Sequence, residues 1–198
     1  MPMRHIFTQG DYDGACFLYA LANAYQAVTG RAPSCRAWDA GIRSLMHSSD
    51  FLGGCIGTTE HFASGPDALQ EAVRIILGSY GGDGPTVDWR AFPEVTDLDG
   101  ITPLVDAYGV VVFRYQGATA KVSDIDHWVC GVAVAARPFR LHLACSFRGT
   151  QDARTEGKRY RERYIQRYDR YSNNWLSRRH EIKFFPSSVF RVGKAGTP

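Results

Sequence analysis

The hydrophobic pattern of this 198-residue chain changes near residue 109. Before that point, apolar side chains recur every three or four positions, the spacing that gathers them on one face of a helix. Residues 15–29 show it most clearly, because Phe17, Leu21 and Val28 share one stripe and Gly30 suits the end of a helix. After that point, β-branched and alternating runs separated by turn residues are typical of strands. The order of these patterns predicts an α+β fold, with helices first and mostly antiparallel strands after them.

The expected elements follow from these patterns and from turn residues between them. Helices are predicted at 15–29, 34–47, 66–77 and 97–108. Strands are predicted at 110–115, 127–135, 141–147, 181–185 and 188–192. A polar helix is predicted over about 155–171, between the two groups of strands. No internal repeat or linker interrupts the chain, so we expect one domain with a helical lobe at about 1–109 and a sheet lobe at about 110–198.

Composition argues against several classes of protein. No run approaches the roughly 20 apolar residues of a membrane span, and residues 1–9 lack the apolar core of a signal peptide. A cytoplasmic location is therefore expected, with delivery by a signal-less secretion system left open. The five cysteines are scattered and form no CxxC pair, so we expect neither a metal nor another cofactor, and no disulfide framework.

Positive charge is concentrated in one segment of a chain whose formal net charge is +3. Residues 154–183 contain ten Lys or Arg and only four Asp or Glu, and Tyr160, Tyr164 and Tyr168 recur there at helical spacing. The favoured interpretation is an amphipathic helix that packs its tyrosines on the sheet and leaves its arginines in water. The alternative is that residues 158–179 bind nucleic acid or an acidic partner.

The segment from Gln9 to Cys16, Q-G-D-Y-D-G-A-C, combines features that favour a reactive thiol. Gly10 and Gly14 allow the backbone a tight approach just before a helix. Cys16 then falls in the first helical turn, where unpaired N–H groups and the positive end of the helix dipole stabilise a thiolate. The Gln9 amide and the Cys16 backbone N–H are candidate donors to an oxyanion. His127, at the start of an apolar strand, is the candidate base.

These segments are similar to a known family. The sequence G-A-C-F at 14–17 resembles the signature G-[SA]-C-[WY] around the nucleophile of papain and the cathepsins. Q-G at 9–10 resembles the pair that supplies their oxyanion hole, and H-W-V at 127–129 resembles the histidine strand of papain-like and C39-type peptidases. Residues 9–23 also resemble uncharacterised bacterial papain-like proteins with a Q-G-D-x-D-G-x-C helix. The resemblance implies a papain-like fold, with the nucleophile on the helical lobe and the base on the sheet.

Two positions depart from the papain pattern. Gln9 and Cys16 are seven positions apart, one more than in papain, so a bulge in the loop must absorb the extra residue. The Asn or Asp that orients the histidine is missing after the histidine strand. Ser146 is the favoured substitute because a hydroxyl accepts a hydrogen bond well, whereas Cys145 is a poorer acceptor and Asp152 lies beyond the strand. A serine there predicts a slower enzyme, or one that works as a dyad.

The sequence thus predicts a cysteine hydrolase that cleaves a peptide, isopeptide or amide bond in a peptide or protein substrate. A papain-fold acyltransferase or amidase remains open, because it would keep Cys16 and His127 and change only the acceptor. A cell-wall NlpC/P60-type hydrolase is disfavoured by the upstream Gln9 and the long spacing from cysteine to histidine. An alternative from another class is a catalytically degenerate papain-fold binding protein that uses the basic segment 158–179.

Overall fold

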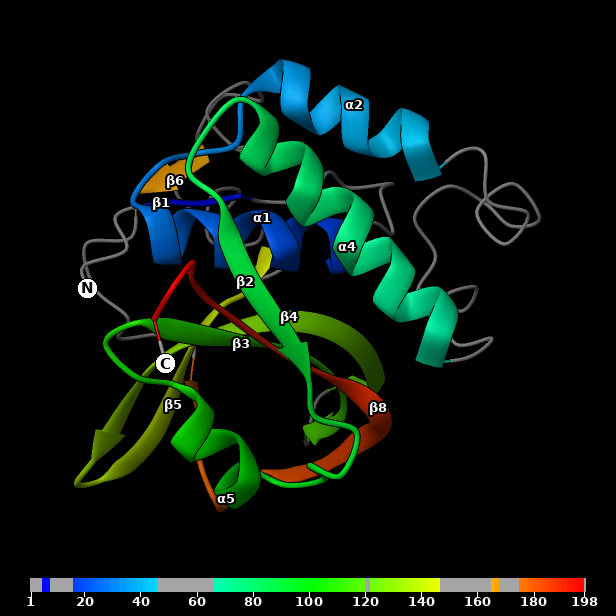
Figure 1. Cartoon of the computed structure of the whole chain (residues 1–198). Coiled ribbons are helices and arrows are strands. Elements are labelled where there is room, and N and C mark those ends of the chain that lie inside the picture. The colour runs from blue at the N-terminus through cyan, green and yellow to red at the C-terminus, as the bar shows by residue number, and fades with distance from the viewer. Residues whose placement is uncertain are drawn as a thin grey trace.

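The α+β class expected from the sequence is confirmed by a computed structural model of the chain. The structure describes residues 5–7, 16–45, 66–119, 122–146, 165–167 and 175–197. Three longer helices lie over one face of an antiparallel sheet, and one short helix lies on the other side of it (Figure 1). In the described parts of the chain, no helix is long and apolar enough to cross a membrane.

The three longer helices confirm the predictions made for them. They are α1 (Cys16–Thr29), α2 (Cys35–Leu45) and α4 (Pro66–Gly82). The Ala37 N–H donates a 3.0 Å hydrogen bond to the Ser34 hydroxyl, which caps the start of α2 as its position in the sequence suggests. Helix α4 continues past its predicted end at residue 77. It does so because Tyr80 is buried and packs edge-on against Tyr25, with 5.3 Å between the ring centroids.

The fourth predicted helix, at 97–108, is much shorter than expected. It consists of α5 (Leu98–Ile101) and the 3-10 turn η2 (Thr102–Leu104). Asp97 caps α5 by accepting a 2.7 Å hydrogen bond from the Gly100 N–H. Pro103 lies inside the predicted span and has no N–H to donate to a helical ladder, so a regular helix does not continue through it.

The main sheet has six strands in the order β2-β8-β3-β4-β5-β7, and every neighbouring pair is antiparallel. The strands are β2 (Val87–Ala91), β3 (Gly109–Thr119), β4 (Val122–Ala136), β5 (Phe139–Ala144), β7 (Trp175–Leu176) and β8 (Glu181–Lys194). The predicted strands at 110–115, 127–135 and 141–147 correspond to β3, β4 and β5. The two strands predicted at 181–185 and 188–192 form the single strand β8.

Strands β2 and β7 have no counterpart among the predicted elements. Each is a short strand at an edge of the sheet and pairs with a strand far from it in sequence, so its own residues carry little periodic signal. Strand β2 falls inside the segment 1–109, which therefore contributes a strand to the sheet as well as helices. The single domain and its division into lobes at 1–109 and 110–198 stay predictions.

The helix predicted over about 155–171 is wrong for the residues that the structure describes there. Residues Ile165–Arg167 form β6, which pairs antiparallel with β1 (His5–Phe7). Strand β7 likewise interrupts the segment 158–179 that was expected to be a basic helix. Backbone pairing with a distant strand overrides helical periodicity here. The other residues of 155–171, including Tyr160, Tyr164 and Tyr168, lie outside the described parts.

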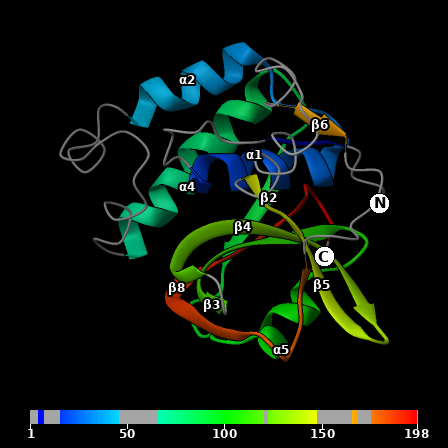
Figure 2. The same cartoon turned by 180° about the vertical axis from the view of Figure 1, so that it is seen from behind.

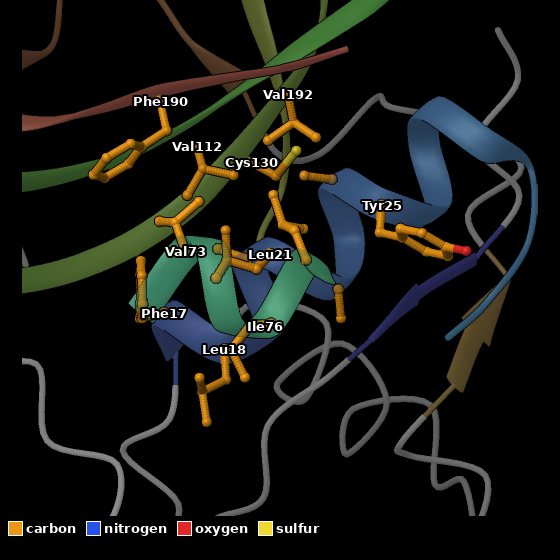
Figure 3. Close-up of a cluster of buried hydrophobic side chains, with 14 of the residues drawn as sticks. Phe17, Leu18, Leu21, Tyr25, Val73, Ile76, Val112, Cys130, Phe190 and Val192 are labelled. Atoms are coloured by element: carbon orange, nitrogen blue, oxygen red, sulfur yellow. The ribbon is translucent and has the colours of Figure 1, made fainter. Parts of the chain in front are cut away.

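The sheet is buried on both faces, which gives the fold two hydrophobic clusters. On the helical side, Phe17 and Leu21 of α1 and Val73 of α4 meet Val112 and Phe190 of the sheet (Figure 3). On the other side, α5 covers a second cluster that includes Val111 and Phe113. Successive residues of a strand point to opposite faces, so β3 supplies both clusters. Helix α1 packs mainly on β4 and β3, with β4 directly beneath it (Figure 2).

Candidate active site

Cys16 is the first residue of α1, as the sequence predicts. Its side chain is buried, with 5% of its surface exposed, and it belongs to the cluster between the helices and the sheet. The first N–H groups of a helix have no partner within that helix, and the positive end of the helix dipole lies there. Both effects favour a negatively charged sulfur at this position.

His127 lies on β4, within the strand rather than at its start, because β4 already begins at Val122. It is 5% exposed, and Tyr115 of β3 is its partner in the antiparallel register. The sequence D-I-D before His127 does not read as an apolar strand, which is why the strand start was placed too late. The imidazole is therefore held by a paired strand on a buried surface.

The side chains of Cys16 and Cys145 both hydrogen-bond to the imidazole of His127. The Sγ atom of Cys145 lies 3.2 Å from Nε2 of His127. Cys145 is 5% exposed and follows directly on the last residue of β5, Ala144. The start of α1 and the end of β5 thus meet at the His127 ring, which lies on β4. The structure unites the predicted nucleophile with the predicted base.

The charge state of the His127 imidazole follows from these contacts. Burial lowers the pKa of His127, but the negative charges and hydrogen bonds of Cys145 and then Cys16 outweigh it and raise the pKa to about 10. At neutral pH the ring is therefore an imidazolium paired with sulfur. Such a charged ring leaves a proton on the histidine for delivery to a leaving group.

Two other ionisable groups of β3 and β4 stay neutral at physiological pH. The pKa of Tyr115 is raised first by burial and then by the charge of Cys145, which places the phenol close to that sulfur. The pKa of the Cys130 thiol is raised by burial, because this side chain is fully enclosed in the core. Cys130 is therefore a packed core thiol, and it differs in this respect from Cys145.

The remaining predicted site residues fall in different places. Ser146 is buried, with 2% exposed, and follows Cys145, but the sulfur of Cys145 makes the 3.2 Å contact with Nε2. The role of Ser146 stays a prediction. Gln9 and Asp152 lie outside the described residues, so the oxyanion donor and the more distant orienting candidate also stay predictions.

The sequence reasoning did not single out Tyr115 or Arg114, which lie on β3 next to β4. Arg114 is 8% exposed, and its guanidinium lies 4.1 Å from the ring centroid of Phe185. The position of Arg114 within the apolar run V-V-V-F-R-Y could have indicated a specific role, since charged residues are rarely buried without a specific reason. Nothing local identified Tyr115, because its place beside His127 depends on the pairing of β3 with β4.

Within the described ranges, no group of three or more His, Cys, Asp or Glu side chains is arranged to hold a metal ion. No family model matches the chain, and a search of curated proteins finds no significant match.

Proposed function

We propose that this protein is a cysteine hydrolase with a papain-like α+β fold, in which Cys16 is the nucleophile and His127 is the acid and base. The observation that carries the proposal is the hydrogen bond between Cys16, at the start of α1, and the imidazole of His127. The three longer helices precede most strands of the antiparallel sheet, and this order supports the same fold.

The reaction begins when the Cys16 thiolate attacks the carbonyl carbon of the substrate. A carbon–sulfur bond forms, and the carbonyl π electrons move to the oxygen, which becomes an oxyanion. The backbone N–H of Cys16 is positioned at the helix start to donate to that oxygen, and Gln9 is its expected companion. The oxyanion then collapses, the bond to the leaving nitrogen breaks, and the imidazolium of His127 gives that nitrogen its proton.

A thioester on Cys16 remains, and the His127 imidazole is now neutral. It takes a proton from an attacking water, so that a carbon–oxygen bond forms and the sulfur leaves as a thiolate. The products are a carboxylic acid and an amine, and the imidazolium–thiolate pair is restored. An amine or alcohol acceptor in place of water would give the acyltransferase alternative, with the same two residues.

The proposal is tested by limited alkylation with iodoacetamide at neutral pH, with the labelled cysteines located by mass spectrometry. Cys16 should react at least tenfold faster than Cys35, an exposed free thiol that serves as an internal reference. Replacement Cys16→Ser should remove this fast label, while Cys130→Ala should leave it intact. Alkylation of Cys16 at or below the rate of Cys35 would show that its thiol is not activated and would contradict the proposal.

A second candidate function is binding of a polyanion, and a specific observation favours it. The guanidinium of Arg140 lies 4.5 Å from the ring centroid of Trp175, and that of Arg178 lies 4.7 Å from the ring centroid of Phe139. These side chains form an arginine and aromatic surface, the Arg140–Arg178 surface, at the β5–β7 edge of the sheet, where Arg178 is also paired with Asp99 at 2.7 Å. Arginine and aromatic side chains are the groups that contact phosphates and bases in single-stranded nucleic acid. Trp175 and Arg178 belong to the segment 158–179 that the sequence suggested as a binding region.

A further inference from the structure

In a histidine that acts as acid and base, each of the two ring nitrogens has its own partner. One nitrogen must face the nucleophile, and the other is usually held by a hydrogen-bond acceptor, which fixes the tautomer and the ring orientation. In this protein Nε2 of His127 lies 3.2 Å from Sγ of Cys145. A nitrogen-to-sulfur contact at this distance is a hydrogen bond. Because Nε2 takes part in it, Nδ1 is the ring nitrogen left to face Cys16.

We propose that Cys145 is the positioning residue of the site: its sulfur accepts the Nε2–H hydrogen bond of His127 and so directs Nδ1 toward Cys16. The inference rests on the proposed function, because ring orientation matters only if Cys16 and His127 react together. It assigns to a thiol the place that an Asn or Asp side chain would fill. Cys145 touches His127 rather than substrate, so it acts through the histidine.

The strand register explains how Cys145 reaches the ring. Ala144, the last residue of β5, is paired with Cys130 of β4. Continued by one residue, this register sets Cys145 opposite Val129, and both side chains belong to the cluster below the sheet. His127 is two positions from Val129 on the same strand, so Cys145 is its diagonal neighbour on one face. Because the side-chain period of a strand is two, a shift of one residue would turn this sulfur away.

A sulfur can serve here because it lies beside a positive charge. A neutral thiol is a weak acceptor, but a thiolate makes a charge-assisted hydrogen bond with an imidazolium. Among the causes that raise the pKa of His127, those from Cys145 come before those from Cys16. His127 of β4 lies 3.2 Å from this sulfur, and the Tyr115 phenol of β3 lies close enough for the charge of Cys145 to raise its pKa in part.

The first test uses the unaltered protein. The nitrogen-15 chemical shifts of the His127 ring should show a proton on Nε2 from pH 6 to 11, both below the pKa of about 10, where the ring is charged, and above it, where the ring is neutral. A neutral ring with its only proton on Nδ1 in this range would mean that Cys145 donates to Nε2 instead of accepting from it. That result would overturn the proposal, and it requires no substitution that could perturb folding.

The second test compares variants by iodoacetamide alkylation of Cys16 and by the titration of His127. Cys145→Ala should slow Cys16 alkylation about ten- to hundredfold, the usual effect of losing a partner that orients a functional histidine. It should also move the titration of His127 to lower pH. Cys145→Asp should keep both properties near those of the unaltered protein, since a carboxylate accepts the same hydrogen bond. Cys130→Ala, which removes another buried thiol, should change neither.

The outcomes separate this inference from the proposed function. If Cys16 is unreactive in the unaltered protein, the proposed function fails, while the ring-nitrogen shifts still decide what Cys145 does. If Cys16 is reactive and neither property changes in Cys145→Ala, the positioning role is excluded and the hydrolase proposal stands. If Cys145→Ala does not fold, Cys145→Asp decides: retained alkylation supports the role, and a loss as large as that in His127→Ala contradicts it.

Discussion

The Sγ atom of Cys145 and the Nε2 atom of His127 are 3.2 Å apart, although the residues are 18 positions apart in the chain. The same imidazole is hydrogen-bonded to Cys16 at the start of α1. One ring therefore links two thiols from different layers of the molecule. Because a thiolate and an imidazolium stabilise each other, removing any of the three side chains should change the ionisation of the other two.

Replacement of His127 by Ala should slow the alkylation of Cys16 by iodoacetamide about 10²-fold or more, in the range of general acid–base effects. The imidazolium that stabilises the Cys16 thiolate is lost, so less thiolate is present at neutral pH. Mass spectrometry of the labelled protein measures the rate. His142→Ala on β5 is the matched control, and an equal slowing in that variant would show that the effect is not specific to His127.

Stability should fall as the pH rises from about 6.5 to about 10. The pKa of His127 is raised from an ordinary value of 6.5 to about 10, so the folded protein binds this proton more tightly than the unfolded chain. The stabilisation is complete below pH 6.5 and is lost as the pH passes through 10, and it amounts to about a few kcal/mol.

This pH dependence is measured by urea unfolding of the unaltered protein and of His127→Gln at a series of pH values. The difference in free energy of unfolding between the two should shrink as the pH rises through this window. A difference that stays constant, or grows, would mean that the proton on His127 does not contribute to folding as stated.

The packing of α1 on the sheet should depend strongly on Phe17. This side chain is 1% exposed and lies 4.6 Å from the ring of Trp128, measured between centroids. Phe17→Ala should lower the free energy of unfolding by about 3–5 kcal/mol, the usual cost of emptying a buried aromatic site. The same variant should slow Cys16 alkylation, because Cys16 is the neighbouring residue of the helix.

Tyr108→Ala is the control for this substitution. Tyr108 is the exposed large hydrophobic residue among the described positions, with 53% of its surface in solvent, so its loss should cost less than about 0.5 kcal/mol. Denaturant unfolding measures both variants. Equal effects of Phe17→Ala and Tyr108→Ala would contradict the placement of Phe17 in the core.

The Arg140–Arg178 surface should bind a single-stranded oligonucleotide if the second candidate function holds. The double substitution Arg140→Ala and Arg178→Ala should weaken binding severalfold and reduce its dependence on salt, because two contacts with phosphate are lost. Fluorescence anisotropy with a labelled oligonucleotide measures the affinity at several salt concentrations. Arg74→Ala is the control, since Arg74 is an ion-paired arginine like Arg178 but lies on α4, outside this surface. Equal weakening by both changes would exclude a specific surface.

The local sequence pattern predicts those helices and strands that are long enough to show a regular hydrophobic repeat. Helix α1 buries an unbroken apolar stripe, and β3 and β4 are long, β-branched strands. Strands β1, β2, β6 and β7 are short, and their pairing partners come from distant parts of the chain. In the case of β6, this pairing displaces a helix that periodicity favoured. A three-residue strand is specified by its partner and not by its own residues.

The sequence by itself determined that a cysteine stands at the first turn of an apolar helix and that a histidine precedes an apolar run. Both follow from local periodicity, and their order in the chain suggested a shared site. Only the tertiary structure decided that the sulfur of Cys145 lies 3.2 Å from Nε2 of His127. A register shift in the β4–β5 ladder between Gly131 and Ala133 lies close by, and such a shift moves every later side chain to the other face. The charge of His127 is equally non-local, because it depends on burial and on sulfur atoms from two other elements.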